Sequence, residues 1–96
     1  MKKEIHTWIF GIGGTEVDDV YTKLIKGTKR QALLYMLKAV KNHKSKDPES
    51  WCDGTETIDD IWESGTGHYC AVGNYYNHHI DYSITLADEA ISLSGT

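Results

Sequence analysis

The segment from His79 to Leu86 alternates strictly between polar and apolar residues, and this pattern constrains the fold more than any other feature of the chain. Successive side chains of a β-strand point to opposite faces, so a two-residue period predicts one buried face and one exposed face. The residues predicted to be buried are Ile80, Tyr82, Ile84 and Leu86. The segment His68–Tyr75 precedes it, and a turn near Tyr76 and Asn77 joins the two as an antiparallel hairpin.

A long amphipathic segment between Thr28 and Lys46 supplies the second constraint. Its apolar residues recur at the three- and four-residue spacing of one helix face, with Leu34 at the edge of that face. The residues on this face are Leu33, Met36, Leu37 and Val40. Thr28 suits a helix N-cap, and Asp47-Pro48 cannot continue a helix. The segment therefore predicts one helix that is long enough to cover one side of a sheet.

Two further strands are expected before this helix. Ile5–Gly13 carries apolar side chains on both faces, which is typical of a strand that is central or covered on both sides. Gly11, Gly13 and Gly14 predict a turn at its end. Val17–Lys26 suits either a strand or a helix, and we interpret it as a second strand because the first strand needs a neighbour.

The connection from helix to hairpin predicts a short helix and no strand. Thr57 and Asp60 have the capping-box spacing, and Gly65 predicts the end of the element. The residues expected to anchor this connection on the core are Trp51, Ile58, Ile61 and Trp62. The chain as a whole predicts one α+β domain over residues 1–96. Its expected order is ββα(α)ββ, a single antiparallel sheet with one main helix packed on one face.

The charges of the chain are unevenly distributed. Eight of the ten basic residues fall between Lys23 and Lys46, where there is no acidic residue, although the net charge is −4. Such an asymmetry steers anionic ligands and basic partners to different surfaces. No apolar stretch has the length of a membrane span, and no signal-peptide pattern is present, so a cytoplasmic location is expected. Cys52 and Cys70 are expected to be reduced thiols.

The densest group of chemically active side chains lies between Gly73 and Ser83. Mixtures of aromatic rings with histidine and asparagine hold flat bases and riboses, and they also occur at protein interfaces. A hairpin with a polar tip and no ligand is the third interpretation. The candidate ligand residues are Tyr75, Tyr76, His78, His79 and Tyr82, with Lys29 and Arg30 attracting phosphate.

Metal binding and catalysis have weaker support in the sequence. A zinc site could be assembled if two strands brought together His68, Cys70, His79 and Asp81, but their spacing matches no zinc signature. Asp81 is placed to orient His79 as an acid–base pair, yet no nucleophile or oxyanion device is recognisable beside it. The glycines of Gly11–Glu16 follow a predicted strand, as in a phosphate-binding loop. The segment lacks the Gly-Lys-Ser/Thr of such a loop, so it is not interpreted as one. We therefore assign no metal, no cofactor and no catalytic residue.

The segments WIFGIGGTE, KGTKRQALLYML and HHIDYS, in a chain of fewer than a hundred residues, resemble short accessory proteins of bacteriophages and prophages. The resemblance covers most of the chain in outline and carries over no catalytic residue. It implies an anti-defence protein that acts by binding in the cytoplasm of a bacterial host. Capture of a small anionic nucleotide signal is the first expectation.

Two other functions remain open beside nucleotide capture. One is direct inhibition of a host defence protein, through the tyrosine-rich hairpin or through an acidic patch. The residues of that patch are Asp53, Glu56, Asp59, Asp60 and Glu63. The other is a small metal- or histidine-dependent enzyme. Three tryptophans and six tyrosines exceed what a small core easily hides, so a homo-oligomer is expected in addition. Specific nucleic-acid binding is not favoured, because the chain is acidic and has one arginine.

Overall fold

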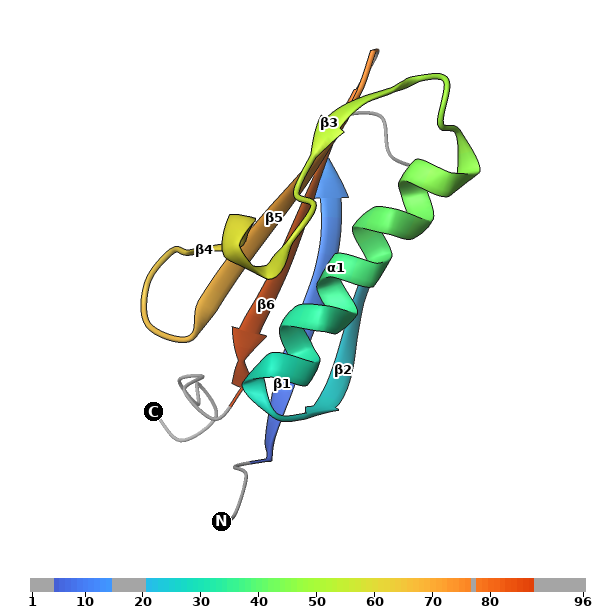
Figure 1. The fold of residues 1–96 in the computed structure, drawn as a ribbon. Helices are drawn as coiled ribbons and strands as arrows, with labels where there is room; N and C mark the ends of the chain where they lie inside the picture. Colours follow the sequence, from blue (N-terminus) through green and yellow to red (C-terminus); the bar gives the residue numbers. More distant parts are fainter. Residues whose placement is uncertain (1–4, 15–20, 77, 88–96) are drawn as a thin grey trace.

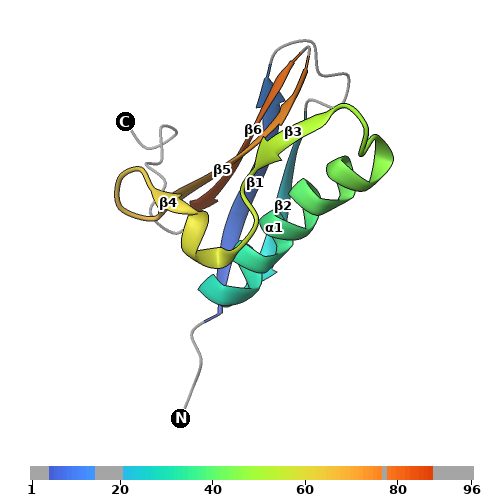
Figure 2. The same cartoon turned by 45° about the horizontal axis from the view of Figure 1, so that its top comes forward.

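The computed structural model describes residues 5–14, 21–76 and 78–87. These residues form one antiparallel sheet and one long helix that lies across a single face of it (Figures 1 and 2). The strand order is β2-β1-β6-β5-β3, and β4 also pairs with β5. The elements are β1 (His6–Gly14), β2 (Tyr21–Gly27), α1 (Lys29–Lys46), β3 (Trp51–Gly54), the 3₁₀ turn η1 (Ile58–Asp60), β4 (Trp62–Glu63), β5 (His68–Tyr75) and β6 (His79–Leu86). The predicted fold class is confirmed.

The hairpin of β5 and β6 has the predicted strand bounds, and β6 has the predicted buried face. Asn74 pairs with His79, and the Tyr75 N–H donates to the His78 carbonyl at 2.9 Å across the turn. Ile80, Tyr82 and Ile84 are 2% exposed or less. β6 lies between β1 and β5 in the sheet, so its apolar face is at the centre of the core.

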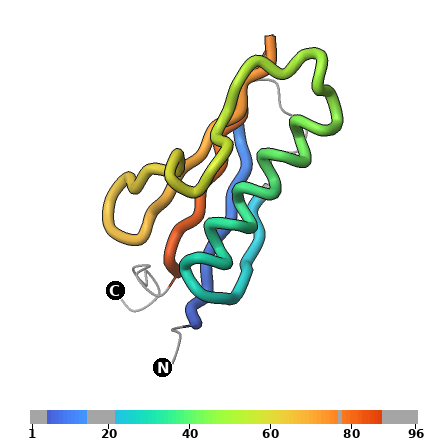
Figure 3. Tube along the Cα trace, viewed as in Figure 1, coloured from blue at the N-terminus to red at the C-terminus, as the bar shows by residue number. Residues whose placement is uncertain are grey.

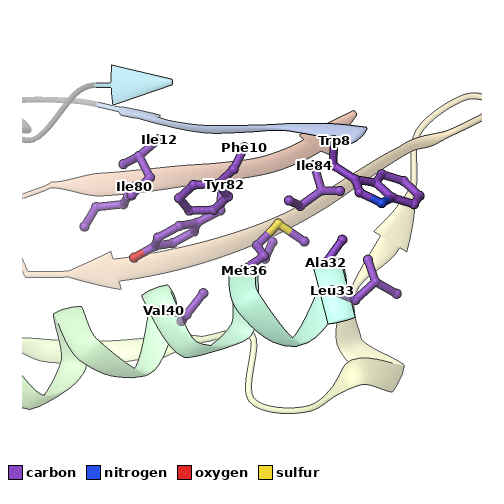
Figure 4. Packing of buried hydrophobic residues seen from close by; sticks show 11 residues of the cluster. Trp8, Phe10, Ile12, Ala32, Leu33, Met36, Val40, Ile80, Tyr82 and Ile84 are labelled. Atoms are coloured by element: carbon purple, nitrogen blue, oxygen red, sulfur yellow. The ribbon is translucent and has the colours of Figure 1, made fainter. Parts of the chain in front are cut away.

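The core is formed between α1 and the central strands. Met36 and Val40 of α1 face Phe10 of β1 and the buried residues of β6 (Figure 4). Thr28 caps the helix as predicted. Its Oγ1 accepts from the Gln31 N–H at 3.2 Å, and Gln31 Oε1 accepts from the Thr28 N–H at 2.8 Å. This reciprocal pair satisfies two backbone groups that a helix start otherwise leaves open.

The connection after α1 differs from the sequence prediction because it adds two short strands, β3 and β4, to the edge of β5. The expected anchoring by Trp62 is wrong, since its side chain is 45% exposed on β4. Trp51 does pack against the core. It has room because Gly54 and Gly73 carry no side chain, and a Cβ at either position would lie within 2.5 Å of its ring.

The predicted glycine turn after β1 is also corrected. Gly11, Gly13 and Gly14 belong to the strand and pair with residues of β6. Of the ambiguous segment 17–26, residues 17–20 lie outside the described residues, and the rest is the predicted second strand, which pairs with β1. The short helix predicted after Thr57 is a single 3₁₀ turn, η1. The Asp60 carboxylate accepts from the N–H groups of Thr57 and Glu56, and these bonds lower the pKa of Asp60.

Candidate functional site

Two tyrosines of the predicted ligand site, Tyr75 and Tyr82, join the sheet to the end of α1. Tyr82 is 1% exposed, and its hydroxyl lies 2.8 Å from His43 Nδ1. The Tyr75 hydroxyl donates to the His43 carbonyl, and the Tyr75 ring meets the Trp51 ring edge-on at 5.1 Å. Burial, and then the charge of Asp47, raise the pKa of Tyr75. Both phenol groups are therefore hydrogen-bonding groups at the rim of the core.

The other predicted residues of the hairpin point to different surfaces. Tyr76 is 74% exposed at the hairpin tip. The His78 ring lies 4.9 Å from the Tyr75 ring. His79 projects from the face of the sheet opposite Tyr82, as the alternation of β6 requires. The five hairpin residues therefore do not share one face of the sheet, because His79 and Tyr82 lie on opposite faces of β6.

His79 belongs to a chain of hydrogen bonds on the face of the sheet that α1 does not cover. Its Nε2 lies 2.7 Å from Asp81 Oδ1, and its Nδ1 lies 2.5 Å from Asn74 Oδ1. The Asn74 amide in turn donates to Asp53 Oδ1 at 2.7 Å. Because Asp53 is on β3, this chain ties β3 to the hairpin. The predicted contact between His79 and Asp81 is confirmed.

The register separates the four residues considered for zinc. His68 pairs with Thr85, with His68 Nδ1 2.8 Å from the Thr85 hydroxyl, and lies six residues along β5 from the partner of His79. That spacing corresponds to about 20 Å. Within the described ranges no three His, Cys, Asp or Glu side chains gather as a metal site would require. Cys70 is a free thiol whose pKa is raised by burial and then by Asp81; Cys52 is also free.

The two predicted cations, Lys29 and Arg30, begin α1, about 20 Å along the helix from His43 in its last turn. Figure 3 shows how far apart the two ends of this helix lie. They border a cavity of about 750 Å³, called the α1 cavity below. Its lining comes from the beginnings of α1 and β1, the end of β6 and the β4–β5 loop. Its lining comprises His6, Trp8, Thr28, Lys29, Arg30, Gln31, Leu34, Glu63, Thr66, Gly67, Tyr69 and Leu86.

Two aromatic rings form the inner part of the α1 cavity. Trp8 is 2% exposed, and its Nε1 donates to the Gly27 carbonyl at 3.0 Å, which fixes the indole against the start of α1. The Tyr69 ring lies 6.3 Å from the Trp8 ring. The Lys29 ammonium stands 4.8 Å from the centre of the Tyr69 ring, within cation–π range. The cavity therefore places a cation directly beside an aromatic face.

The β4–β5 loop forms a fixed rim of the α1 cavity. The Leu86 N–H donates to the Gly67 carbonyl at 2.7 Å, which joins the loop to the end of β6. Gly65 and Gly67 have φ values of 97° and 73°, a conformation that suits glycine. Among the described residues of the lining, Glu63 is the one carboxylate, against the cations Lys29 and Arg30.

Comparison of the chain with protein-family models, with curated proteins and with solved structures gives no match. Ligand chemistry must therefore be inferred from the cavities and surfaces themselves. Among the described residues, no helix has the length and apolar character needed to cross a membrane.

Trp8 and Tyr69 are the site residues that the sequence analysis did not select. Trp8 has the apolar spacing of the core face, and the first part of the hairpin draws no attention beside its polar tip. The sheet register brings them together on the two sides of β6. Trp8 of β1 pairs with Leu86 of β6, and Tyr69 of β5 pairs with Ile84 of β6. A cavity that holds cations, rings and one carboxylate is suited to a small anion that carries a flat ring.

Proposed function

We propose that this protein captures a small anionic ligand of the nucleotide type in the α1 cavity. The observation that carries the proposal is that two cations, Lys29 and Arg30, and two aromatic residues, Trp8 and Tyr69, line one cavity of about 750 Å³. Cavities that bury small organic ligands are commonly about 300–1,000 Å³ and combine apolar walls with a few polar groups.

The phosphate part of the ligand would bind at the cationic side. Arg30 makes no side-chain hydrogen bond or ion pair within the part of the chain that the structure describes. Its planar guanidinium can therefore engage two phosphate oxygens at once. The Thr28 hydroxyl oxygen and the side-chain oxygen Oε1 of Gln31 already accept hydrogen bonds within the helix cap. This leaves Lys29 and Arg30 as the anion-binding groups.

The base would lie along the aromatic side of the cavity. Leu34 and Leu86 extend the apolar wall formed by Trp8 and Tyr69. Stacking of a base on an aromatic ring contributes about 1–3 kcal/mol. Glu63 is placed at the cavity to accept hydrogen bonds from a ribose hydroxyl or an exocyclic amine. This arrangement favours a nucleotide over inorganic phosphate.

The resemblance to phage accessory proteins suggests the biological setting of such binding. In that setting we propose that the protein sequesters a nucleotide signal of bacterial immunity. A binding protein that removes a signal need not transform it, and the proposal requires no catalytic residue. Its effect would follow from stoichiometric capture by many copies of a small chain.

A thermal-shift screen tests the proposed function. Cyclic mononucleotides, cyclic dinucleotides, AMP and ADP-ribose are added to the purified protein. One nucleotide class is expected to raise the melting temperature by roughly 10 °C or more at about a hundredfold excess over its Kd. The same nucleotide should give little or no shift with the double variant Lys29→Glu and Arg30→Glu. Lys38→Glu, the same charge reversal at an exposed position of α1, should preserve the shift.

Two results would contradict this proposal. A shift that survives the double variant but is lost in Tyr76→Ala would move the ligand to the hairpin. No shift with any nucleotide would exclude capture of the tested classes.

Direct inhibition of a host protein is the second candidate. The observation that favours it is an exposed acidic edge along β3, η1 and β4, opposite the β2 edge of the sheet. All five carboxylates of the predicted acidic patch are exposed: Asp53, Glu56, Asp59, Asp60 and Glu63. A basic partner on this edge would bind more weakly at high salt. This candidate predicts that Asp59→Lys weakens capture of a host protein, while the Lys29 and Arg30 variants do not.

A further inference from the structure

The face of the sheet opposite α1 is formed by alternate residues of β2, β1, β6 and β5, and it is called the open face here. In Figure 2, α1 lies on one side of the sheet, and among the described residues no element packs on the other. Leu24 of β2 is 69% exposed on this face, and its register partner is Ile9 of β1. Leu24 on the edge strand β2 and Ile9 on the neighbouring strand β1 therefore form a small apolar area on this face.

We propose that a second copy of this chain covers the open face, in a two-fold dimer formed by sheet-on-sheet packing. On the open face, Ile9 of β1 and Ile5 just before this strand are apolar, while Trp8, Phe10 and Ile12 are apolar on the other face. Apolar residues on both faces are the pattern of a strand that is covered on both sides. Within the described residues, α1 covers one of these faces. A second sheet would supply the missing cover for Ile9 and Leu24. The dimer is independent of the ligand proposed for the α1 cavity.

The centre of the open face is low and flat enough for a second sheet. Gly11 and Ser83 face each other across β1 and β6, and Gly11 pairs with Thr22 on its other side. This row has no bulky side chain, because its residues are Thr22, Gly11 and Ser83. Two sheets packed face to face lie about 10 Å apart, which small central residues and flanking aliphatic ones can fill.

The charges on the open face are complementary to themselves under a two-fold rotation. Lys26 stands at one end, beside Thr7, and Asp81 stands at the other end, beside Gly13. β1 lies between the two strands that carry them. A two-fold axis that passes over the middle of β1 and lies parallel to the sheet exchanges these two ends. Lys26 of each copy would thereby approach Asp81 of the other, and the Asp81 side chain is 65% exposed.

The area of the open face is sufficient for a modest dimer. Four strands about 4.8 Å apart, each contributing about seven residues of about 3.4 Å, give roughly 500 Å². Two copies would bury about 1,000 Å² in total, which is near the lower limit of specific interfaces. We therefore expect a dimer that forms in the micromolar range and dissociates on dilution.

Sedimentation equilibrium over a series of micromolar concentrations tests the dimer. The wild-type chain should approach twice its monomer mass of 10.8 kDa. Leu24→Asp should remain monomeric with an unchanged circular dichroism spectrum, because Leu24 is exposed and its loss leaves the core intact. Lys26→Glu and Asp81→Lys should each weaken the dimer at least several-fold. The combined variant should regain most of the lost affinity, because the exchanged charges again face each other.

Three outcomes would overturn the proposed dimer. The first is a wild-type chain that stays monomeric at the highest concentration. The second is a dimer that persists in Leu24→Asp, which would place the contact elsewhere. The third is a dimer that Asp81→Lys does not weaken, which would favour edge-to-edge pairing of two β2 strands. None of these results would bear on nucleotide binding, which is measured separately in the α1 cavity.

Discussion

Phe10→Ala is expected to lower the free energy of unfolding by about 3–5 kcal/mol, because it removes a buried aromatic ring and leaves a cavity. Phe10 is 0% exposed on β1, and its ring meets the Tyr35 ring edge-on at 5.1 Å. β1 is a central strand, held between β2 and β6. A chain of this length is commonly stable by about 5–14 kcal/mol, so the loss is a large part of the total.

Urea denaturation followed by circular dichroism measures this loss. The control is Ile5→Ala, just before the same strand, where the side chain is 56% exposed. Its expected effect is within about 0.5 kcal/mol. Equal effects for the two variants would contradict the placement of the core between α1 and β1.

Gly14→Ala is expected to lower the free energy of unfolding by about 2 kcal/mol or more. Gly14 has a φ of 144°, a backbone conformation that residues with a side chain rarely adopt. An added Cβ would lie 2.1 Å from the His79 carbonyl oxygen, which is backbone and cannot turn away. The end of β1 would therefore have to separate from β6.

Gly13→Ala is the matched control for this prediction. An added Cβ at Gly13 meets nothing within 4 Å, so the variant should lose well under half as much stability. Urea denaturation of the two proteins side by side gives the comparison. If both glycines tolerate alanine equally, the pairing of Gly14 with Ile80 is not as described.

The main elements of the fold could be predicted because local patterns determine them. The alternation from His79 to Leu86 fixes which face of β6 is buried, whatever strand lies beside it. The helix from Lys29 to Lys46 has both a cap at Thr28 and a stop at Asp47-Pro48. Each of these features acts over a few neighbouring residues and needs no knowledge of the remaining chain.

The strands β3 and β4 could not be predicted because their stability comes from partners far away in the sequence. Trp51–Gly54 has no strand alternation of its own, and it pairs with β5 twenty or so residues later. The Trp51 ring fits because Gly73 leaves room for it. The buried Thr55 also depends on a partner far away in the sequence. Its hydroxyl accepts from the Val72 N–H at 3.0 Å, and its own N–H donates to the Val72 carbonyl.

For the candidate site, the charge pattern points to Lys29 and Arg30, and both border the α1 cavity. The composition of the chain points to the hairpin tip for the aromatic partners. The sheet register instead brings Trp8 and Tyr69 together, with the Lys29 ammonium over the Tyr69 ring. Residue composition identifies which side chains can bind a nucleotide. Only the register decides which of them share a cavity.

The three tryptophans allow the most direct test of nucleotide capture in the α1 cavity. The indole N–H signals in a ¹H–¹⁵N spectrum are recorded during titration with the nucleotide panel. Trp8 lines the α1 cavity, while Trp51 packs against Tyr75 at the far end of the molecule. We expect the Trp8 signal to move in a saturable way and the Trp51 signal to stay in place. Movement of Trp51 alone would place the ligand at the hairpin, and a spectrum unchanged by every nucleotide would contradict nucleotide capture.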